Sequence, residues 1–395
     1  MEKRYREDMK RLKECMKRAE GGGELTIGFL GGSITQGSLA SEQGKTYARR
    51  VFAWWKETFP QAVFHYVNGG IGGTTSHYGA ARAVTDLLMY QPDFVVVDFS
   101  VNDEGNSFFQ ETYEGVVRRL LSWPSSPAVV LLHNVFYDSG ANAQETHDKV
   151  GEWYALPYVS IRDTVYRRME KGEFALEELT PDGLHPNDKG HELIAGEIIR
   201  LLNRGKEEAD AERRAGWPKL NVEGPERAKP IKEGEDEKPG MSSLGKTEKK
   251  VLPRPMTANC YEHAKRLTIR EISPILDGFR ADTEEKQGHL DTFKNGWIGK
   301  KAGDRIVFEL EASCIAVQYR KSVKKPALRA ALVLDGDNDH PVLLDGNFEE
   351  DWGDCQYLQP ILHYGKRKRH RIEICILQDG AKEAVSFYLM GIIVA

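Results

Sequence analysis

Five short apolar runs in the first half of the chain alternate with stretches of helical periodicity, and this alternation limits the fold more than any other feature. The runs cover residues 25–30, 63–67, 94–99, 128–132 and 158–161, and no internal repeat relates them. Strands that alternate with helices in this way form a parallel sheet with helices on both faces. Residues 1–203 are therefore predicted to form a three-layer α/β domain.

The first apolar run ends at a glycine pair that is followed directly by Ser33. A run of this length that stops at glycine is typical of a buried strand leading into a tight turn. Such a turn holds a small polar side chain clear of its neighbours, which makes Ser33 a candidate nucleophile. A serine after two glycines is more often a plain turn or a helix cap, so the assignment depends on partners elsewhere in the chain.

A second chemical signal precedes the last helix of the predicted domain. Asp182 and His185 lie three residues apart, with Gly183 between them and Pro186 directly after. At this spacing a carboxylate can accept a hydrogen bond from one imidazole nitrogen and hold the other toward a serine hydroxyl. Loops beyond the carboxyl ends of parallel strands converge at one edge of the sheet, so we expect Ser33 to lie beside this pair.

Acyl transfer by a serine also needs hydrogen-bond donors for the developing oxyanion. The glycine-rich loop 69–73 follows the second strand and lets backbone N–H groups approach a ligand closely. Asn102 follows the third strand and offers a side-chain amide, and the Ser33 N–H is a third donor. Each feature alone predicts only a turn or a strand-end cap. Four loops of complementary chemistry at one edge of a sheet favour a catalytic site.

Four motifs resemble, in order, the sequence blocks of the SGNH (GDSL-like) hydrolases. They are Gly31-Gly-Ser-Ile-Thr35, Gly72-Gly-Thr74, Asn102-Asp103 and Asp182-Gly-Leu-His-Pro186. The resemblance extends over the first half of the chain and implies a flavodoxin-like α/β/α fold and ester hydrolysis. It also implies the site residues: Ser33 as nucleophile, His185 as base, Asp182 as its orienting acid, and Ser33, Gly73 and Asn102 as oxyanion donors.

Two positions depart from the pattern of this family. Gly32 stands where an aspartate usually precedes the serine, and Ser100 stands where a glycine usually lies two places before Asn102. Neither position has a chemical role in the predicted two-step acyl transfer, which needs no metal or organic cofactor. The departures place the chain away from the lipase-like branch of the family and make a long-chain lipid substrate less favoured.

Composition narrows the range of partners. The chain has 55 Lys and Arg against 60 Asp and Glu and no dominant basic stripe, which argues against nucleic acid. No apolar run approaches the roughly 20 residues that span a bilayer, and the charged N-terminal residues do not resemble a secretory signal, so we expect no membrane partner. The five cysteines are far apart and lack Cys-x-x-Cys spacing, which predicts reduced thiols, no zinc site and a cytoplasmic protein.

The second half of the chain has a different pattern. Residues 204–250 are charged and rich in Pro and Gly, which predicts a linker or a solvated excursion. Residues 251–395 show apolar stretches of period two between Gly, Asp and Asn turns, which predict an antiparallel β-sandwich. This region resembles carbohydrate-binding jelly rolls. Trp352 in an acidic turn is a candidate for stacking on a sugar ring, and Trp297 is a weaker one because it precedes a strand.

A leading hydrolase domain and a trailing sandwich resemble bacterial carbohydrate acetylesterases. We therefore expect a serine esterase, monomeric or homo-oligomeric, that removes O-acetyl groups from mannan- or xylan-derived oligosaccharides. Two alternatives stay open: a lysophospholipase or thioesterase, and a non-catalytic glycan-binding protein. Nucleotide binding at the glycine-rich loops is disfavoured, because neither loop has the Gly-x-x-x-x-Gly-Lys or complete Gly-x-Gly-x-x-Gly pattern.

Overall fold

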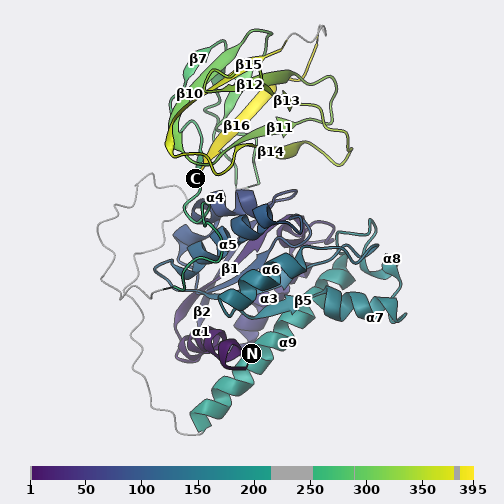
Figure 1. Cartoon of the computed structure of the whole chain (residues 1–395). Helices are drawn as coiled ribbons and strands as arrows, with labels where there is room; N and C mark the ends of the chain where they lie inside the picture. Colours follow the sequence, from purple (N-terminus) through teal and green to yellow (C-terminus); the bar gives the residue numbers. More distant parts are fainter. Residues whose placement is uncertain (1, 215–251, 289, 378–382) are drawn as a thin grey trace. The chain divides into compact units, whose positions relative to one another are not determined.

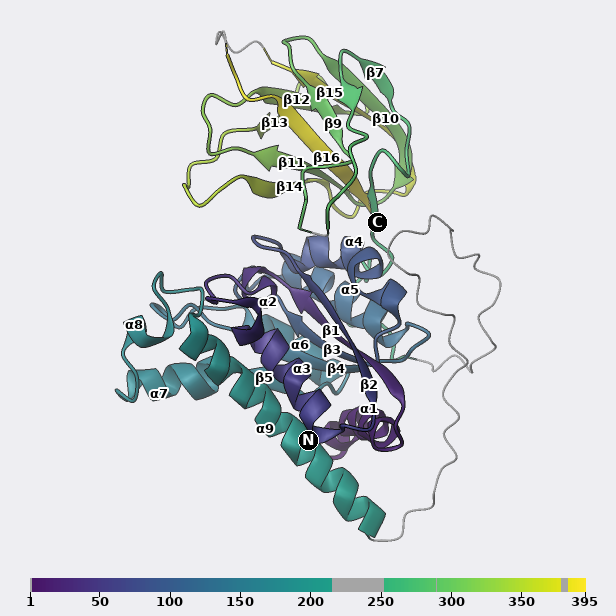
Figure 2. The same ribbon diagram turned by 180° about the vertical axis from the view of Figure 1, so that it is seen from behind.

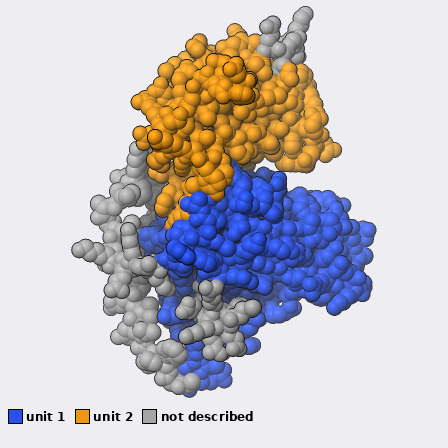
Figure 3. Space-filling view, viewed as in Figure 1, with its two compact units in different colours: residues 1–79, 83–258 blue, residues 80–82, 259–395 orange. Residues whose placement is uncertain are grey.

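The computed structural model describes residues 2–214, 252–288, 290–377 and 383–395, which belong to two compact units. Unit 1 consists of residues 1–79 and 83–258, and unit 2 consists of residues 80–82 and 259–395 (Figure 3). Within the described ranges, no helix has the length and apolar content that crossing a membrane requires.

A five-stranded parallel sheet forms the centre of unit 1 (Figure 1). Its strands, in spatial order, are β2 (Val63–Gly70), β1 (Glu24–Gly31), β3 (Phe94–Asp98), β4 (Ala128–His133) and β5 (Tyr158–Ser160). This 2-1-3-4-5 order is that of flavodoxin-like sheets. Gly31 at the end of β1 pairs with Gly70 of β2 and with Asp98 of β3, so the three strands end level with one another.

Helices cover both faces of this sheet (Figures 1 and 2). One face carries α1 (Glu2–Glu20), α3 (Tyr47–Thr58) and α9 (Asp188–Arg214), whose buried side chains share one core with the sheet. The other face carries α4 (Ser76–Asp86), α5 (Ser107–Leu121) and α6 (Gln144–Trp153). The short elements are α2 (Ser33–Gln36), η1 (Gln43–Lys45), η2 (Leu88–Tyr90), η3 (Arg162–Tyr166), α7 (Arg167–Glu170) and α8 (Leu176–Leu179). The predicted three-layer α/β fold is therefore confirmed.

The last helix of unit 1 is longer than the sequence analysis expects. The predicted linker begins at residue 204, but α9 continues through Arg214. Gly205 lies against Met9 and Leu12 of α1, where an added Cβ would come within 3.0 Å of the Met9 side chain. Lys206 and Asp210 form an ion pair at 2.8 Å one turn apart. Packing on α1 therefore extends the helix into the charged stretch, and the rest of the predicted linker, residues 215–250, lies outside the described residues.

The chain after the predicted linker first packs on unit 1 rather than entering the sandwich. The Glu114 carboxylate of α5 is fully buried and accepts hydrogen bonds from the backbone N–H groups of Met256, at 2.6 Å, and Thr257, at 2.8 Å. The Trp153 indole of α6 donates to the carbonyl of Arg254 at 3.0 Å. Residues 252–258 thus belong to unit 1, although the sequence analysis assigns them to the sandwich.

Unit 2 is a pair of antiparallel sheets around one core. The first sheet has the order β13 (Val342–Asp345), β12 (Arg329–Leu334), β15 (Lys368–Ile376), β10 (Arg305–Ala312) and β7 (Ile275–Asp277). The second has the order β14 (Cys355–Leu362), β11 (Ile315–Lys321), β16 (Phe387–Val394), β9 (Trp297–Gly299) and β8 (Arg280–Ala281), with β6 (Lys265–Leu267) paired to β16. The alternating residues of the inner strands fill the core, as in β10, where Ile306, Phe308 and Leu310 are buried.

The two tryptophans singled out in the second half have opposite environments. Trp297 is 1% exposed and packs edge-on against Phe308 in the core of unit 2, so it is not available to a sugar ring. Trp352 is 56% exposed, and its ring packs edge-on against Phe348. The difference follows from position: β9 runs through the core, whereas Trp352 lies in the turn between β13 and β14.

Candidate active site

Ser33, His185 and Asp182 form one continuous chain of hydrogen bonds. The Oγ of Ser33 lies 2.8 Å from Nε2 of His185, and Nδ1 of His185 lies 2.7 Å from Oδ2 of Asp182. Because an ionised carboxylate only accepts, Nδ1–H donates to Asp182 and Nε2 is left to accept the Ser33 hydroxyl proton. The serine side chain thus lies next to the imidazole nitrogen that a general base would use.

Asp182 is held by more than the imidazole. Its Oδ1 accepts from the backbone N–H groups of Leu184, at 3.0 Å, and His185, at 2.7 Å, and from the Thr180 hydroxyl at 3.0 Å. Partial burial raises the pKa of Asp182, but the hydrogen bonds from His185 and from the backbone of Leu184 outweigh it and lower the pKa to about 2. The carboxylate is therefore ionised throughout the neutral range.

The loop that carries this pair is anchored to the sheet edge and to α9. Gly183 has a φ of +80°, and its carbonyl accepts from the Tyr137 N–H at 2.7 Å. Asn187 caps α9, since its side-chain oxygen accepts from the N–H groups of Lys189 and Gly190 at 3.0 and 3.1 Å. The left-handed glycine and the helix cap together fix where the short loop turns.

His191, in the first turn of α9, joins this loop to the nucleophile segment. Its Nδ1 accepts from the Tyr47 N–H at 3.3 Å, and its Nε2–H donates to the Ser38 carbonyl at 3.2 Å. Because Nδ1 accepts, the first bond requires a neutral ring. Burial is the main cause that lowers the pKa of His191 to about 4. This residue is not among the predicted site residues, because nothing near it in the sequence shows which groups it contacts.

The nucleophile turn depends on close approach of other chain segments to Gly31 and Gly32. A Cβ at residue 31 would lie 2.5 Å from the Asp98 carbonyl oxygen, and one at residue 32 would lie 2.2 Å from Oδ1 of Asn102. Gly32, one of the two departures from the family pattern, therefore lets the Asn102 amide lie directly beside the serine turn. The other departure, Ser100, is buried and donates to the Asn134 carbonyl at 2.8 Å, which links the loops after β3 and β4.

The predicted oxyanion donors are brought to the same edge. Gly72 lies near Ser33, where an added Cβ would be 3.7 Å from the Ser33 Cβ, and its N–H donates to Oε1 of Gln36 at 2.6 Å. Gly73, the next residue, has a φ of +66°. Among the described residues, the Ser33 N–H, the Gly73 N–H and the Asn102 side-chain amide have no hydrogen-bond acceptor in the protein. Three donors around one serine can stabilise negative charge that develops on a bound ligand.

A second carboxyl group, Asp98, lies buried beneath the nucleophile turn. Its Oδ2 accepts from the Thr35 hydroxyl at 3.0 Å and from the Asn134 amide at 2.9 Å. Burial raises the pKa of Asp98 to about 7, although both hydrogen bonds act in the opposite direction. Asp98 is not among the predicted site residues. The signal available was an aspartate at the end of an otherwise apolar strand.

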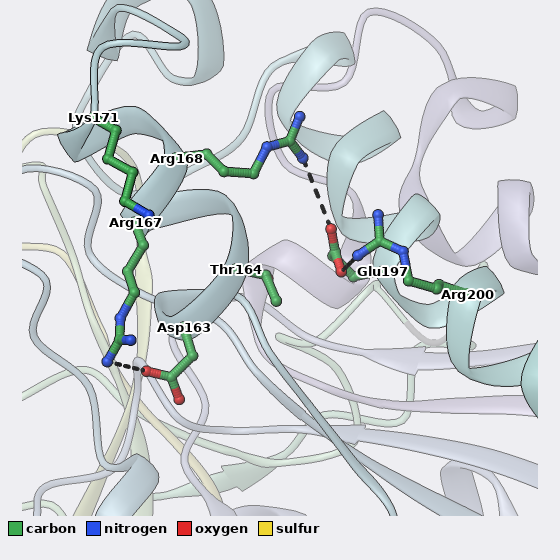
Figure 4. A pocket seen from close by; sticks show the side chains of 7 residues that line it. All are labelled: Asp163, Thr164, Arg167, Arg168, Lys171, Glu197 and Arg200. Carbon is green, nitrogen blue, oxygen red and sulfur yellow. Dashed lines mark hydrogen bonds and ion pairs between the residues drawn. The ribbon is translucent and has the colours of Figure 1, made fainter.

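A surface hollow of about 400 Å³ lies elsewhere on unit 1, between the segment 163–171 and α9. Figure 4 shows the guanidinium groups of Arg168 and Arg200 turned toward Glu197, and that of Arg167 toward Asp163. The lining includes none of the predicted site residues. In the described part of the chain, no three His, Cys, Asp or Glu side chains are grouped so as to hold a metal ion.

Comparison with known proteins gives three informative matches. The model of the GDSL-like lipase/acylhydrolase family matches residues 29–193. A crystal structure of a two-domain esterase active on acetylated mannans, co-crystallised with mannopentaose, is 43% identical with a TM-score of 0.85, over 97% of this chain and 94% of that chain. An arylesterase from Vibrio mimicus is 23% identical over 211 residues, which are 48% of this chain and 94% of the arylesterase.

We expect Gly32→Ala to slow the hydrolysis of p-nitrophenyl acetate because the new Cβ displaces the Asn102 amide. The loss expected from a misplaced oxyanion donor is about 10²-fold in kcat, with a smaller change in KM. Gly196→Ala is the matched control, since a Cβ there meets nothing within 4 Å. Equal kcat values for the two variants would contradict the importance of this close approach.

His191 should make unit 1 less stable as the pH falls. Because its pKa is about 4 in the folded chain and about 6.5 when unfolded, the unfolded state binds more protons in this window. The stability that the neutral ring contributes is full above pH 6.5 and is lost as the pH falls toward 4. The gap in unfolding free energy between the wild type and His191→Leu should therefore narrow by up to about 3 kcal/mol. Urea unfolding of both proteins across this pH range measures the gap, and a gap that does not change with pH would refute the low pKa of His191.

Proposed function

The chain belongs to the family of GDSL-like lipases and acylhydrolases and is a carboxylic ester hydrolase, and we propose that it removes O-acetyl groups from oligosaccharides through Ser33. The observation that carries the proposal is the hydrogen-bond chain from Asp182 through His185 to Ser33, with contacts of 2.7 and 2.8 Å. Three unpaired donors beside the serine support it. The protein contributes only side chains and backbone amides to the proposed reaction.

The first step forms an acetyl-enzyme. Nε2 of His185 takes the proton of the Ser33 hydroxyl as Oγ attacks the acetyl carbonyl carbon. Negative charge then develops on the carbonyl oxygen, where the N–H groups of Ser33 and Gly73 and the Asn102 amide donate to it. The tetrahedral intermediate collapses, the bond to the sugar oxygen breaks, and His185 returns its proton to that oxygen.

The second step releases acetate. A water molecule replaces the departed sugar hydroxyl, and Nε2 of His185 takes its proton as the water oxygen attacks the acetyl carbon. The same three donors stabilise the second tetrahedral intermediate. When it collapses, the bond between the acetyl carbon and Oγ of Ser33 breaks, and His185 returns its proton to Oγ. Asp182, ionised because its pKa is about 2, stabilises the imidazolium that forms in both steps.

The proposed substrate is a short acetylated mannan chain, with xylan-derived chains as the nearest alternative. Support comes from the 43% identity to an esterase active on acetylated mannans, which extends over both units of this chain. Unit 2 also presents a partly exposed aromatic pair, Trp352 and Phe348, of the kind that stacks on sugar rings. We assign Trp352 to sugar binding on this basis.

Ser33→Ala should lower acetate release from acetylated manno-oligosaccharides by at least about 10³-fold while glycan binding is retained, since only the nucleophile is lost. Mass spectrometry of the acetylated chains after incubation, and calorimetric binding of the same chains, measure the two effects. Ser122→Ala, at the exposed end of α5, is the control and should behave as wild type. Acetate release by the Ser33 variant at the wild-type rate would refute the mechanism.

The preference for acyl-chain length distinguishes the proposed enzyme from a lysophospholipase or thioesterase. A site for acetylated sugars should hydrolyse p-nitrophenyl acetate faster than the octanoate, because a long acyl chain needs an apolar trench to lie in. A preference for octanoate, with no acetate released from manno- or xylo-oligosaccharides, would instead support the alternative.

Trp352→Ala should raise KM for acetylated manno-oligosaccharides about 5- to 10-fold through loss of ring stacking, and leave the hydrolysis of p-nitrophenyl acetate unchanged. Trp352→Phe keeps an aromatic face and should restore most of the affinity. Initial-rate kinetics with both substrates provide the comparison. Unchanged KM values for the oligosaccharide would remove Trp352 from the proposed binding surface.

A further inference from the structure

The carboxylate of Asp103 is buried directly beside the proposed oxyanion donor Asn102. Its Oδ1 accepts from the Ser76 N–H at 2.8 Å, and its Oδ2 accepts from Nε2 of His147 at 3.0 Å. The side chains of Asp103 and His147 are both 0% exposed. The N–H groups of Asn102 and Asp103 both donate to the Phe99 carbonyl at 3.0 Å. This tight turn means that a shift of the Asp103 carboxylate also displaces Asn102.

Asp103 also determines where the loop of the other proposed donor ends. Ser76 is the first residue of α4 and follows Gly73 by three positions. At the opposite end of this loop, Ile71 N–H donates to the Gly31 carbonyl at 3.1 Å and Gly72 N–H donates to Gln36 at 2.6 Å. Gly73 therefore lies between one anchor on the nucleophile segment and a second anchor on Asp103.

His147 supplies a hydrogen-bond donor that the buried carboxylate needs. Its ring stacks on Tyr113, with centroids 3.6 Å apart and planes 2° apart, and its Nδ1 has no partner among the described residues. The start of α6 is tied to the loop after β3, since Ala143 N–H donates to the Ser100 carbonyl at 2.7 Å. A buried carboxylate that loses a donor is destabilised and must shift, take up a proton or admit water.

We infer that Asp103 and His147 form a positioning pair that holds the Asn102 and Gly73 loops at the spacing the oxyanion requires. The inference rests on the proposed roles of these two donors. Neither side chain of the pair touches the reacting atoms. Since the donors act most strongly when charge develops on the carbonyl oxygen, loss of the pair should reduce kcat and leave KM nearly unchanged.

The test compares His147→Gln with His147→Leu on p-nitrophenyl acetate. The glutamine Nε2 occupies nearly the place of the imidazole Nε2 and can donate to Asp103, whereas leucine fills the volume without a donor. We expect leucine to lower kcat about 10- to 100-fold with KM within about 3-fold of wild type, and glutamine to restore kcat to within about 5-fold. The rate of inactivation by a phosphonate ester, whose tetrahedral oxygen also uses the oxyanion donors, should fall in parallel with kcat.

Val150→Ala is the control for damage to α6, because it opens a cavity in the same helix without touching Asp103. It should lower the melting temperature and leave kcat unchanged. If the leucine variant does not fold, Asp103→Asn replaces it. The amide side chain has one acceptor oxygen, so it cannot accept from the two donors at two positions as the carboxylate does. A kcat loss at constant KM is again expected.

Three results would overturn the inference. The first is a wild-type kcat in the leucine variant, or in Asp103→Asn where that variant replaces it. The second is an equal loss of kcat with glutamine and leucine, and the third is a rise in KM at constant kcat. Ser33→Ala, measured in the same assay, distinguishes failure of the positioning pair from failure of the proposed function. An active Ser33→Ala variant refutes the proposed function itself. An inactive Ser33→Ala variant beside a fully active His147→Leu variant refutes only the positioning pair.

Discussion

The close approach of chain segments at the carboxyl edge of the parallel sheet is the constraint on which the site depends. Added Cβ atoms at Gly31, Gly32 and Gly70 would come within 2.5, 2.2 and 2.3 Å, respectively, of atoms in neighbouring segments. Larger residues at these positions would push the serine turn away from the loops after β2 and β3. The absence of side chains there lets Ser33 lie within hydrogen-bonding distance of His185, 152 residues further along the chain.

Buried polar groups beneath this edge hold the turn in place. Asp98 accepts from Thr35 of the nucleophile segment and from Asn134 after β4, and Asp103 accepts from the start of α4 and from α6. Hydrogen bonds lower the cost of burying a carboxyl group, so each of these two groups favours a definite arrangement of the segments that supply its donors. The rigidity that the proposed oxyanion site needs thus comes from groups that do not touch the substrate.

The site residues that the sequence alone identifies are those whose contacts or turn geometry depend on nearby positions in the chain. Asp182 and His185 are three residues apart, so their contact is local, and Ser33 follows a strand and two glycines that predict its exposed turn. His191, Asp98 and His147 were missed because their hydrogen-bond partners lie 36 to 153 residues away in the sequence. The end of α9 was misjudged for a related reason: its packing on α1, rather than its own charged composition, continues the helix to Arg214.

The alternation of apolar runs and helices by itself determined the layered fold of unit 1, because backbone hydrogen bonding and burial leave few other ways to cover such strands. The period-two pattern likewise determined that the second half forms antiparallel sheets. Only the tertiary structure decided which polar atoms meet: that the hydroxyl of Ser33 reaches Nε2 of His185, that Trp297 lies in the core while Trp352 is exposed, and that one carboxylate joins two donor loops. These are contacts between distant segments, and they depend on atomic packing distances that a linear pattern of residue types does not contain.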